Sequence, residues 1–549
     1  MSPFAGYARA VFRRVERCLA TQVKTDLLTV LPGGRTLSGP TLLRQIRETA
    51  LELGRVGIGA ESRALLSTSQ SLSLILAVPA LWSLGAVPLL AEGGLAADEM
   101  NEMVRRFAPD RVLSEREALP GTAGPAGLPE GAELFLCSTS SVPRRALPRG
   151  TVLVRMTSGS SGAPRGVALA ASQILADTLN ILSHFRIGPE VPTLAALSIS
   201  HAFGFSTLLV PLLFHGNSMV LLEKPLPEQF REALHRDGPF FFPGVPYLFD
   251  LLCRAGLSKR SLGRLGLCVS AGAPLPEATA TRFRERSGLP IRNFYGCSEC
   301  GAIAADRSRR GTSRPGCVGT PLPGVRVFLA AVRGVGNPAG VPGAKIGRIG
   351  VLSDGVALGY VGTGARERLK GGRFLTEDLG LFDARGRLHL LGRLDRIINV
   401  GGRKVRPEEV ERALAATKGV REVVALAIPD PSRGEAVGAA VAGRRGLRIE
   451  ELLATCRRRL SAHKVPRRIQ ILADLPRTGR GKVDLELLRK LLVAPEPLSP
   501  ASTRGRRPDS RLPRTEGKPR PAGSSRAPRP ARGPRPPRSD FPTRRTLQR

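Results

Sequence analysis

A run of small and hydroxylated residues between two apolar segments constrains the fold of this chain most. Residues 156–167 read MTSGSSGAPRGV, with apolar segments 150–155 before them and 167–170 after them. We expect two strands joined by a loop. Glycines let a backbone approach a bulky anion, and hydroxyls with a guanidinium donate to phosphate oxygens. The run predicts a triphosphate-binding loop, with a flexible turn as the alternative. It is not of the Walker type, because no Gly-Lys-Ser/Thr closes it.

The segments around this loop alternate helical and strand patterns, which indicates an α/β fold. With 549 residues, the chain is too long for a single core. We predict a large N-terminal domain at 1–392, made of layered α/β sheets with a β-rich subdomain from about 315. A hinge at 393–395 then leads to a small, mobile α+β domain at 396–494.

Several elements are predicted from local patterns. Ser172 is the expected N-cap of a helix that ends at Phe185. Further helices are expected at the N-terminus and at 41–53, 276–287, 406–415 and 447–460, and strands at 134–137, 265–270, 291–295 and 420–428.

Residues 72–91 form the most apolar window and are long enough to suggest a membrane span. Pro79, Gly85 and Pro88 interrupt the window, and it also contains two serines. A buried helix followed by a turn and a strand explains this pattern better.

The chain is strongly basic, with a net charge of +37, and its basic residues comprise 72 arginines but only 11 lysines. Such an excess of arginine over lysine indicates a coding bias more than a dedicated polyanion-binding surface. The eight cysteines are scattered, and no signal peptide opens the chain, so we expect reduced thiols and a cytoplasmic location. Cys297 and Cys300 have CxxC spacing without a second pair at a zinc-like distance.

From residue 495 the composition changes abruptly. Residues 495–549 contain 13 prolines and 15 basic residues against four acidic ones. A segment with so few large apolar residues cannot bury enough surface to fold, so a disordered basic tail is expected. The tail is a candidate for weak contact with a polyanion or an anionic membrane, without specific nucleic-acid recognition.

Motifs that carry chemistry recur along the folded part of the chain. They are TSGSSGAPRG at 157–166, YGCSE at 295–299, TED at 376–378, GRLD at 392–395, NVGGRKVRPEE at 399–409 and PRTGRGK at 476–482.

In their order and spacing these motifs resemble the adenylate-forming superfamily of acyl- and aryl-acid:CoA ligases. The resemblance runs from about residue 10 to 493. Ser161, Arg165, Ser298 and Glu377 stand where the family usually has Thr, Lys, Thr and Gly. The resemblance implies that ATP and a carboxylic acid form an acyl adenylate, and that the acyl group then passes to CoA or to a carrier-protein pantetheine.

The resemblance also implies roles in nucleotide binding. Glu299 is the expected Mg²⁺ ligand, helped by the Thr157 hydroxyl; its alternative is a solvated turn acid. Asp378 is expected to bind the ribose hydroxyls, and Arg393 the ribose or a phosphate, unless Arg393 forms only a surface salt bridge. The other residues expected to contact the nucleotide are Ser158, Gly159, Ser160, Ser161, Gly162, Arg165, Gly166, Gly272, Ala273, Tyr295, Gly296 and Ser298.

Lys482 is implied to bridge the substrate carboxylate and the α-phosphate during adenylation only. Asp395 is the expected hinge residue, and Gly401 and Gly402 are expected to leave room for a pantetheine arm. His201, Phe203, Gly204 and Val245 are the candidate walls of the acid pocket, although His201 alone is also compatible with a structural role.

Two alternatives to a CoA ligase stay open at this point. One is a ligase that loads an acyl carrier protein. The other is a non-catalytic relative that binds polyanions through its tail, as the departures at positions 161, 165 and 377 allow. Amino-acid activation is disfavoured, because residues 201–205 contain no acid to hold an ammonium group.

Overall fold

The computed structural model divides the chain into two units, Met1–Ala494 and Pro495–Arg549. The second unit, where the sequence predicts a disordered tail, lies outside the described residues. The structure describes residues 3–22, 26–95, 97–115, 123–127, 133–138, 146–158, 164–236, 238–308, 311, 316–332, 345–362, 369–400, 403–430, 433–460, 462–478 and 483–493.

A sheet with eight strands among the described residues contains the hairpin around the predicted phosphate loop. Strands β8 (Leu153–Ser158) and β9 (Pro164–Leu169) pair antiparallel, and β8 also pairs parallel with β4 (Val87–Ala91). The prediction of two strands joined by a loop is therefore confirmed. The remaining strands are β19 (Gly359–Val361), β3 (Arg63–Ser67), β5 (Arg111–Ser114), β7 (Glu133–Ser138) and β6 (Ala123–Gly127).

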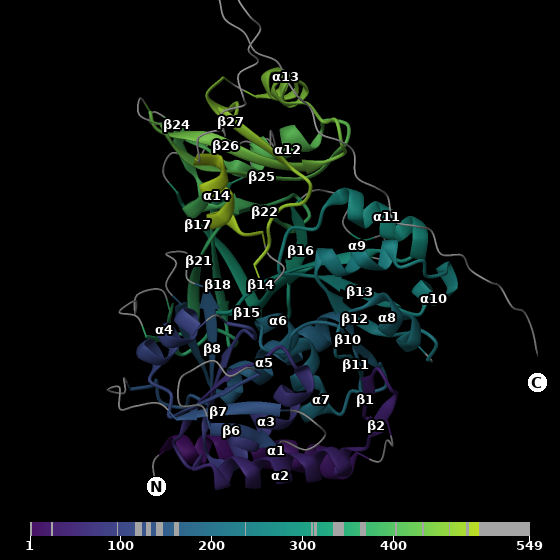
Figure 1. The fold of residues 1–549 in the computed structure, drawn as a ribbon, viewed down its shortest axis with the longest axis vertical. Coiled ribbons are helices and arrows are strands. Elements are labelled where there is room, and N and C mark those ends of the chain that lie inside the picture. The colour runs from purple at the N-terminus through teal and green to yellow at the C-terminus, as the bar shows by residue number, and fades with distance from the viewer. Residues whose placement is uncertain are drawn as a thin grey trace, which may run out of the picture. The chain divides into compact units, whose positions relative to one another are not determined.

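A larger mixed sheet of 14 strands, counted over the described residues, runs through the middle of the molecule (Figure 1). Its parallel half orders β1 (Leu28–Leu31), β11 (Met219–Leu222), β10 (Thr193–Ala195), β12 (Phe241–Gly244), β13 (Leu267–Ser270) and β14 (Ile291–Cys297), with β2 (Arg35–Leu37) at the edge. Its antiparallel half contains β15 (Gly301–Ala305), β16 (Cys317–Pro321), β17 (Val325–Ala330), β18 (Ile346–Ser353), β20 (Leu369–Lys370), β21 (Arg373–Phe382) and β22 (Leu388–Arg393).

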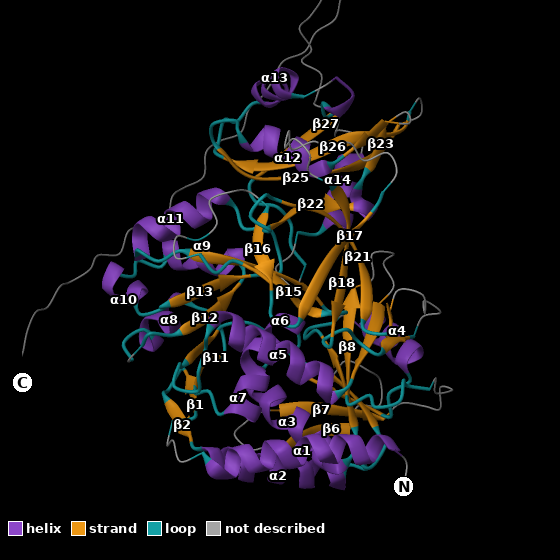
Figure 2. Ribbon diagram, turned by 180° about the vertical axis from the view of Figure 1, so that it is seen from behind, coloured by secondary structure: helices purple, strands orange, loops and turns teal. Residues whose placement is uncertain are grey.

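Three helices near the N-terminus pack side by side, as both ribbon views show (Figures 1 and 2). They are α1 (Pro3–Thr21), α2 (Gly39–Arg55) and α3 (Ser71–Leu84). The apolar window forms the buried helix α3, a left-handed turn at Gly85 and strand β4, as predicted. No helix among the described residues is long and apolar enough to cross a membrane.

The other helices of the large region mostly connect strands of the central sheet. They are α4 (Ala97–Phe107), α5 (Ala171–Phe185), α6 (Ala202–Gly204), a π-helix (Phe205–Leu209), α7 (Val210–His215), α8 (Pro227–Ala233), α9 (Pro246–Arg254), α10 (Lys259–Gly263) and α11 (Glu277–Ser287).

The C-terminal part has a sheet and cores of its own. In β25 successive side chains enter different cores, Val424 and Leu426 in one and Ala425 in the other, because they alternate between the faces of the sheet. The elements are η3 (Leu394–Arg396), β23 (Ile398–Val400), β24 (Arg403–Val405), α12 (Pro407–Ala415), β25 (Val420–Asp430), β26 (Gly434–Gly443), α13 (Ile449–Arg459), η4 (Ala462–Lys464), β27 (Arg468–Leu472) and α14 (Leu485–Val493).

The mixed α/β fold, with a large N-terminal and a small C-terminal domain, is confirmed, while the exact domain limits and the hinge stay predictions. The N-cap prediction is wrong. Helix α5 begins at Ala171, so Ser172 lies inside it, and the side-chain oxygen of Gln173 accepts a hydrogen bond from the Ala170 N–H at 2.7 Å. The predicted strand at 291–295 continues to Cys297 because its end pairs with β15.

Candidate active site

Strands β8 and β9 form the hairpin that carries the predicted phosphate loop, and we call it the phosphate hairpin. The structure describes this hairpin on both sides of its tip. Thr157 lies opposite Arg165 in the strand register, and the Thr157 hydroxyl donates to the Arg165 carbonyl oxygen at 3.4 Å. Gly166 has a packing reason to be glycine, since a Cβ there would lie 2.9 Å from Val154 Cγ1. The tip itself lies outside the described residues, as does the Ser158 side chain. The roles predicted there therefore stay predictions: Ser158, Gly159, Ser160, Ser161 and Gly162.

Tyr360 links this hairpin to the predicted metal ligand. It pairs with Val167 in the β19–β9 register, and its hydroxyl donates to Glu299 Oε1 at 3.0 Å. The Arg165 guanidinium carbon lies 5.9 Å from the centre of the Tyr360 ring. Burial and the Glu299 carboxylate raise the pKa of Tyr360, so this hydroxyl remains a donor. The sequence prediction did not include Tyr360; an aromatic residue within a glycine-rich strand pattern was its only signal.

Glu299 lies in the turn between β14 and β15. Its carbonyl oxygen accepts from the Ala357 N–H at 2.8 Å, which fixes the turn to a neighbouring segment. Within the described residues no three acidic, histidine or cysteine side chains form a metal cluster. Magnesium often binds through one or two protein oxygens together with substrate phosphates. The carboxylate of Glu299 and the hydroxyl of Thr157 are hard oxygen donors of this kind, so they fit Mg²⁺.

Asp378 forms a second acidic position, at the β21–β22 hairpin. The Tyr295 hydroxyl donates to Asp378 Oδ2 at 2.6 Å, and Arg393 Nη1 lies 3.4 Å from Oδ1. Burial raises the pKa of Asp378, while Tyr295 and Arg393 oppose that rise. Thr376 supports the backbone, since its hydroxyl accepts from the Asp378 N–H at 3.0 Å. The structure therefore brings together three residues that the sequence predicts for one end of the nucleotide.

Arg393 joins this acid to the predicted hinge residue. Its Nε and Nη2 donate to the two carboxylate oxygens of Asp395 at 2.9 and 2.7 Å. Hydrogen bonding to Asp395 is the main cause that raises the pKa of Arg393. Because 42% of the Arg393 side chain is exposed, these ion pairs lie at the surface, where a ligand can compete for the guanidinium.

Two acid-pocket candidates and two residues predicted for nucleotide binding follow the parallel strands of the central sheet. His201 follows β10, Val245 follows β12, Gly272 follows β13, and Gly296 lies beyond the parallel part of β14. Ligands of parallel sheets bind at this edge. Gly272 has φ +81°, and a Cβ there would lie 3.5 Å from Val245 Cγ1. The exposed Ala273 follows Gly272 at the same edge.

Two further pocket candidates lie in α6, which follows His201. The centres of the Phe203 and Phe294 rings lie 4.9 Å apart, and Phe294 precedes Tyr295 in β14. Gly204 packs so closely on the Ser198 carbonyl oxygen that no Cβ would fit. Phe203 is thus near the predicted nucleotide residues, whereas Gly204 is required by packing.

Lys482, Gly401 and Gly402 lie outside the described residues, so their roles stay predictions. The hairpin that carries the two glycines is described at its base, where Val400 pairs with Arg403.

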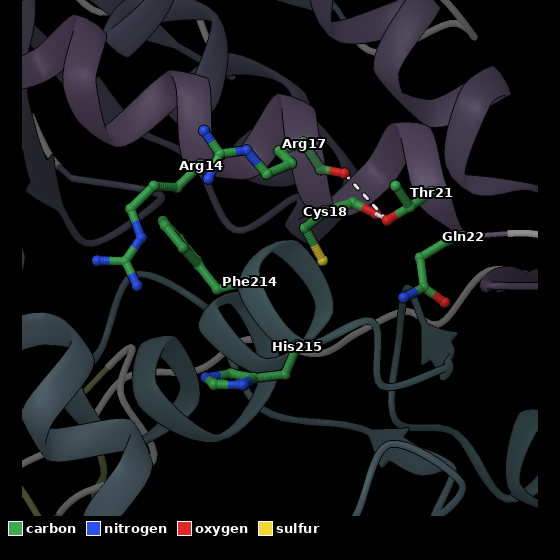
Figure 3. A pocket seen from close by; sticks show the side chains of 7 residues that line it. All are labelled: Arg14, Arg17, Cys18, Thr21, Gln22, Phe214 and His215. Atoms are coloured by element: carbon green, nitrogen blue, oxygen red, sulfur yellow. Dashed lines mark hydrogen bonds between the residues drawn. The ribbon is translucent and has the colours of Figure 1, made fainter.

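A separate cavity of about 440 Å³ lies between α1 and α7 (Figure 3). Its described lining contains none of the predicted site residues, and burial together with Arg14 lowers the pKa of its histidine, His215. The lining residues are Arg14, Arg17, Cys18, Thr21, Gln22, Phe214 and His215.

Comparison with known proteins gives evidence on the family of this chain. The profile of the AMP-binding enzyme family matches residues 18–361, and that of the AMP-binding enzyme C-terminal domain matches residues 409–482. A sulfoacetate–CoA ligase from Cupriavidus necator is 32% identical over 62% of this chain and 67% of its own length. A 4-chlorobenzoate–CoA ligase from an Arthrobacter species is 27% identical over 84% of this chain and 91% of its own.

The fold also matches solved structures. ATP-bound MatB from Rhodopseudomonas palustris aligns with a TM-score of 0.74 and 24% identity, covering 88% of this chain and 99% of that one. Since the first family profile alone matches more than half of the chain, this protein belongs to the AMP-binding enzymes, the adenylate-forming superfamily that its motifs resemble.

Proposed function

We propose that this chain is an ATP-dependent carboxylic acid ligase that forms an acyl adenylate, releases pyrophosphate, and then forms a thioester with CoA. The observation that carries the proposal is the pair of tyrosine–carboxylate contacts. Tyr360 holds Glu299 beside the phosphate hairpin, and Tyr295 holds Asp378 beside Arg393. Together these contacts supply groups for both ends of a nucleotide.

In the first half-reaction a substrate carboxylate oxygen attacks the α-phosphorus of ATP, and the bond to pyrophosphate breaks. Both reactants are anionic, so the site must neutralise charge as the transition state forms. Arg165 and the hydroxyls of the loop would hold the leaving pyrophosphate. Asp378 would accept from the ribose hydroxyls, and Lys482 would contact both reacting groups.

Mg²⁺, when bound by Glu299 and Thr157 together with the phosphates, supplies additional positive charge for this step. Tyr360 orients the Glu299 carboxylate through its hydroxyl.

In the second half-reaction the thiol sulfur attacks the acyl carbonyl carbon, and AMP leaves. No nucleophilic side chain is required, because the mixed anhydride is already activated. We propose that the small domain rotates about Asp395 between the half-reactions, so that Gly401 and Gly402 admit the pantetheine arm. Delivery to a carrier-protein pantetheine is the alternative; an assay with CoA and with a holo-carrier protein would decide between them.

The acid is proposed to be a fatty or aryl acid. The two relatives are named for different acids, sulfoacetate and 4-chlorobenzoate, so they do not narrow the choice. Hydroxamate trapping of the adenylate across aliphatic, aromatic and amino acids tests the proposal. A clear preference for an amino acid, or no trapped adenylate with any acid, would contradict it.

Replacement of Lys482 by alanine tests the assigned chemistry. We expect Lys482→Ala to slow adenylate formation by about 10²- to 10³-fold, because a charge that stabilises the transition state is lost. Thioester formation from a synthetic acyl adenylate should survive. An equal loss of both half-reactions would contradict the role of Lys482.

A non-catalytic protein that binds polyanions through residues 495–549 is the other alternative. Deletion of these residues separates the two functions. Unchanged ligase activity with lost binding to RNA or to anionic vesicles would assign the two functions to different parts of the chain. Cytoplasmic location stays a prediction.

A further inference from the structure

Asp177, in α5, is a buried acid that contacts the start of β15, close in the chain to Glu299. It is 7% exposed, and both of its carboxylate oxygens accept hydrogen bonds. The Ser206 hydroxyl donates to Oδ2 at 2.5 Å, and the Ala302 N–H donates to Oδ1 at 2.8 Å. One carboxylate therefore connects α5, the π-helix and the first residues of β15.

The contact with β15 fixes the turn that carries Glu299. Gly301 has φ +67°, and a Cβ at this position would collide with the Asp177 carboxylate. The turn therefore packs against Asp177 at Gly301, two residues after Glu299. Because a charged acceptor strengthens a hydrogen bond to a backbone N–H, the ionised form of Asp177 holds the turn best.

The contact with Ser206 extends this support toward the acid pocket. Ser206 belongs to the π-helix that follows Phe203 and Gly204, and its carbonyl oxygen accepts from the Thr178 hydroxyl at 3.1 Å. Two neighbouring residues of α5 therefore hold the π-helix. Such π-helical turns are frequent at functional sites.

A buried cation packs on the π-helix that Asp177 holds. Arg155, in β8, is 3% exposed, and its guanidinium carbon lies 5.3 Å from the centre of the Phe205 ring. Burial lowers the pKa of Arg155 to about 10, whereas the charges of Asp177 and Glu299 act in the opposite direction. Arg155 and Thr157 share one face of β8, so the cation lies on the strand that enters the phosphate hairpin.

We infer that Asp177 is a positioning residue that holds the Glu299 turn against the phosphate hairpin. This inference rests on the proposed function, since it assigns to Asp177 an effect on nucleotide binding. Asp177 itself touches no reacting atom; it acts through the backbone of the Glu299 turn and through the π-helix.

The test compares two buried aspartates with the same hydrogen-bonding pattern. Asp306, 4% exposed, accepts from the Ser308 N–H at 2.9 Å and from the Ser308 hydroxyl at 3.0 Å, and neither of these bonds involves a predicted site residue. Asp177→Asn and Asp306→Asn each replace a buried carboxyl group with an amide of nearly the same size. Binding of a fluorescent, non-hydrolysable ATP analogue is measured with and without Mg²⁺, together with the melting temperature.

We expect Asp177→Asn to weaken Mg²⁺-dependent nucleotide binding about tenfold or more, because hydrogen bonds to a charged acceptor are lost. Metal-free binding should change much less. Asp306→Asn should lower the melting temperature without this change in Mg²⁺ dependence. Equal losses of nucleotide affinity in the two variants would overturn the inference. So would a loss of affinity in each variant that is proportional to the drop in its melting temperature.

Variants of Arg155 provide the second arm. Arg155→Met should reproduce the binding defect, because Arg155 packs on Phe205, next to the Ser206 that donates to Asp177. The double variant with Asp177→Asn should be no worse than the poorer single variant, because both residues then act through the π-helix. Arg155→Lys should restore part of the Mg²⁺ dependence. Additive losses in the double variant would contradict this shared action. Failure of the unaltered chain to bind the ATP analogue would instead contradict the proposed function.

Discussion

The two tyrosine–carboxylate pairs are alike in chemistry but differ in how they are held. Tyr360 donates to only one oxygen of Glu299, and within the described residues Glu299 Oε2 has no hydrogen-bond partner. At Asp378 both oxygens are engaged, one by Tyr295 and the other by Arg393. An acid that binds a cation needs a free lone pair, whereas an acid that orients a sugar benefits from being fixed in advance.

The supports behind the two pairs differ as well. The Glu299 turn rests on the buried Asp177, whereas Asp378 connects through the half-exposed Arg393 to Asp395. A buried charge that loses its hydrogen-bond partners is strongly destabilised, while surface ion pairs exchange partners at little cost in free energy. The Glu299 end is therefore suited to a fixed geometry, and the Asp378 end to a change of partners near the hinge.

Removing the charge of Glu299, the proposed Mg²⁺ ligand, should give the largest effect. Glu299→Gln keeps an acceptor for Tyr360 but removes the charge, so adenylation should slow by about 10²- to 10³-fold. The measurement is single-turnover adenylate formation at saturating ATP and Mg²⁺. Nucleotide binding without Mg²⁺ serves as the control and should be nearly unchanged. Near-normal adenylation would contradict the difference between the two pairs.

Removing the charge of the second acid should mainly affect nucleotide affinity. Asp378→Asn weakens the acceptor for the ribose hydroxyls, so the KM for ATP should rise about 10- to 100-fold. At saturating ATP, kcat should fall much less than in Glu299→Gln, and steady-state kinetics would measure both constants. A fall confined to kcat would contradict the assignment of nucleotide affinity to Asp378 and of the chemical step to Glu299.

Helix α5, which carries Asp177, also carries His184, and this histidine gives a test based on stability. Burial, followed by the charge of Arg307, lowers the pKa of His184 to about 4 from 6.5. Below pH 6.5 the unfolded chain then binds more protons than the folded one, so stability falls as the pH falls toward 4. At pH 5 the loss should be about 2 kcal/mol relative to pH 7.5.

Urea unfolding of the unaltered chain and of His184→Gln at the two pH values measures this loss. The variant should show a smaller pH-dependent change than the unaltered chain. An identical change in both would assign the pH dependence to other groups.

The smallest effects should come from the tyrosine hydroxyls. Tyr295→Phe and Tyr360→Phe each remove one hydrogen bond to a carboxylate, worth about 1.5 kcal/mol, or roughly tenfold. Tyr295→Phe should raise the KM for ATP, and Tyr360→Phe should raise the Mg²⁺ concentration needed for half-maximal activity. Titration of each variant with ATP and with Mg²⁺ measures these two changes. The same response in both variants would contradict different roles for the two tyrosines.

Much of the fold was predictable because local patterns dominate there. The helix and strand within residues 72–91, the strands around the phosphate loop and helix α12 all follow from periodicity and from glycine or proline breaks. Strand β26 was missed because its sequence, GEAVGAAVAG, consists mostly of small residues, whose weak alternation gives little signal. The start of α5 was misplaced because a glutamine side chain, rather than Ser172, satisfies its first backbone donor.

The family, the β8–β9 hairpin and the candidate acids could be predicted from the sequence alone, because each prediction depends on short motifs in a fixed order. The contacts of Tyr360 with Glu299, of Tyr295 with Asp378 and of Asp177 with Ala302 become evident only in the folded structure. These contacts join residues 61, 83 and 125 positions apart. Which residues meet over such distances depends on strand order, register and core packing, and local periodicity contains no information about them.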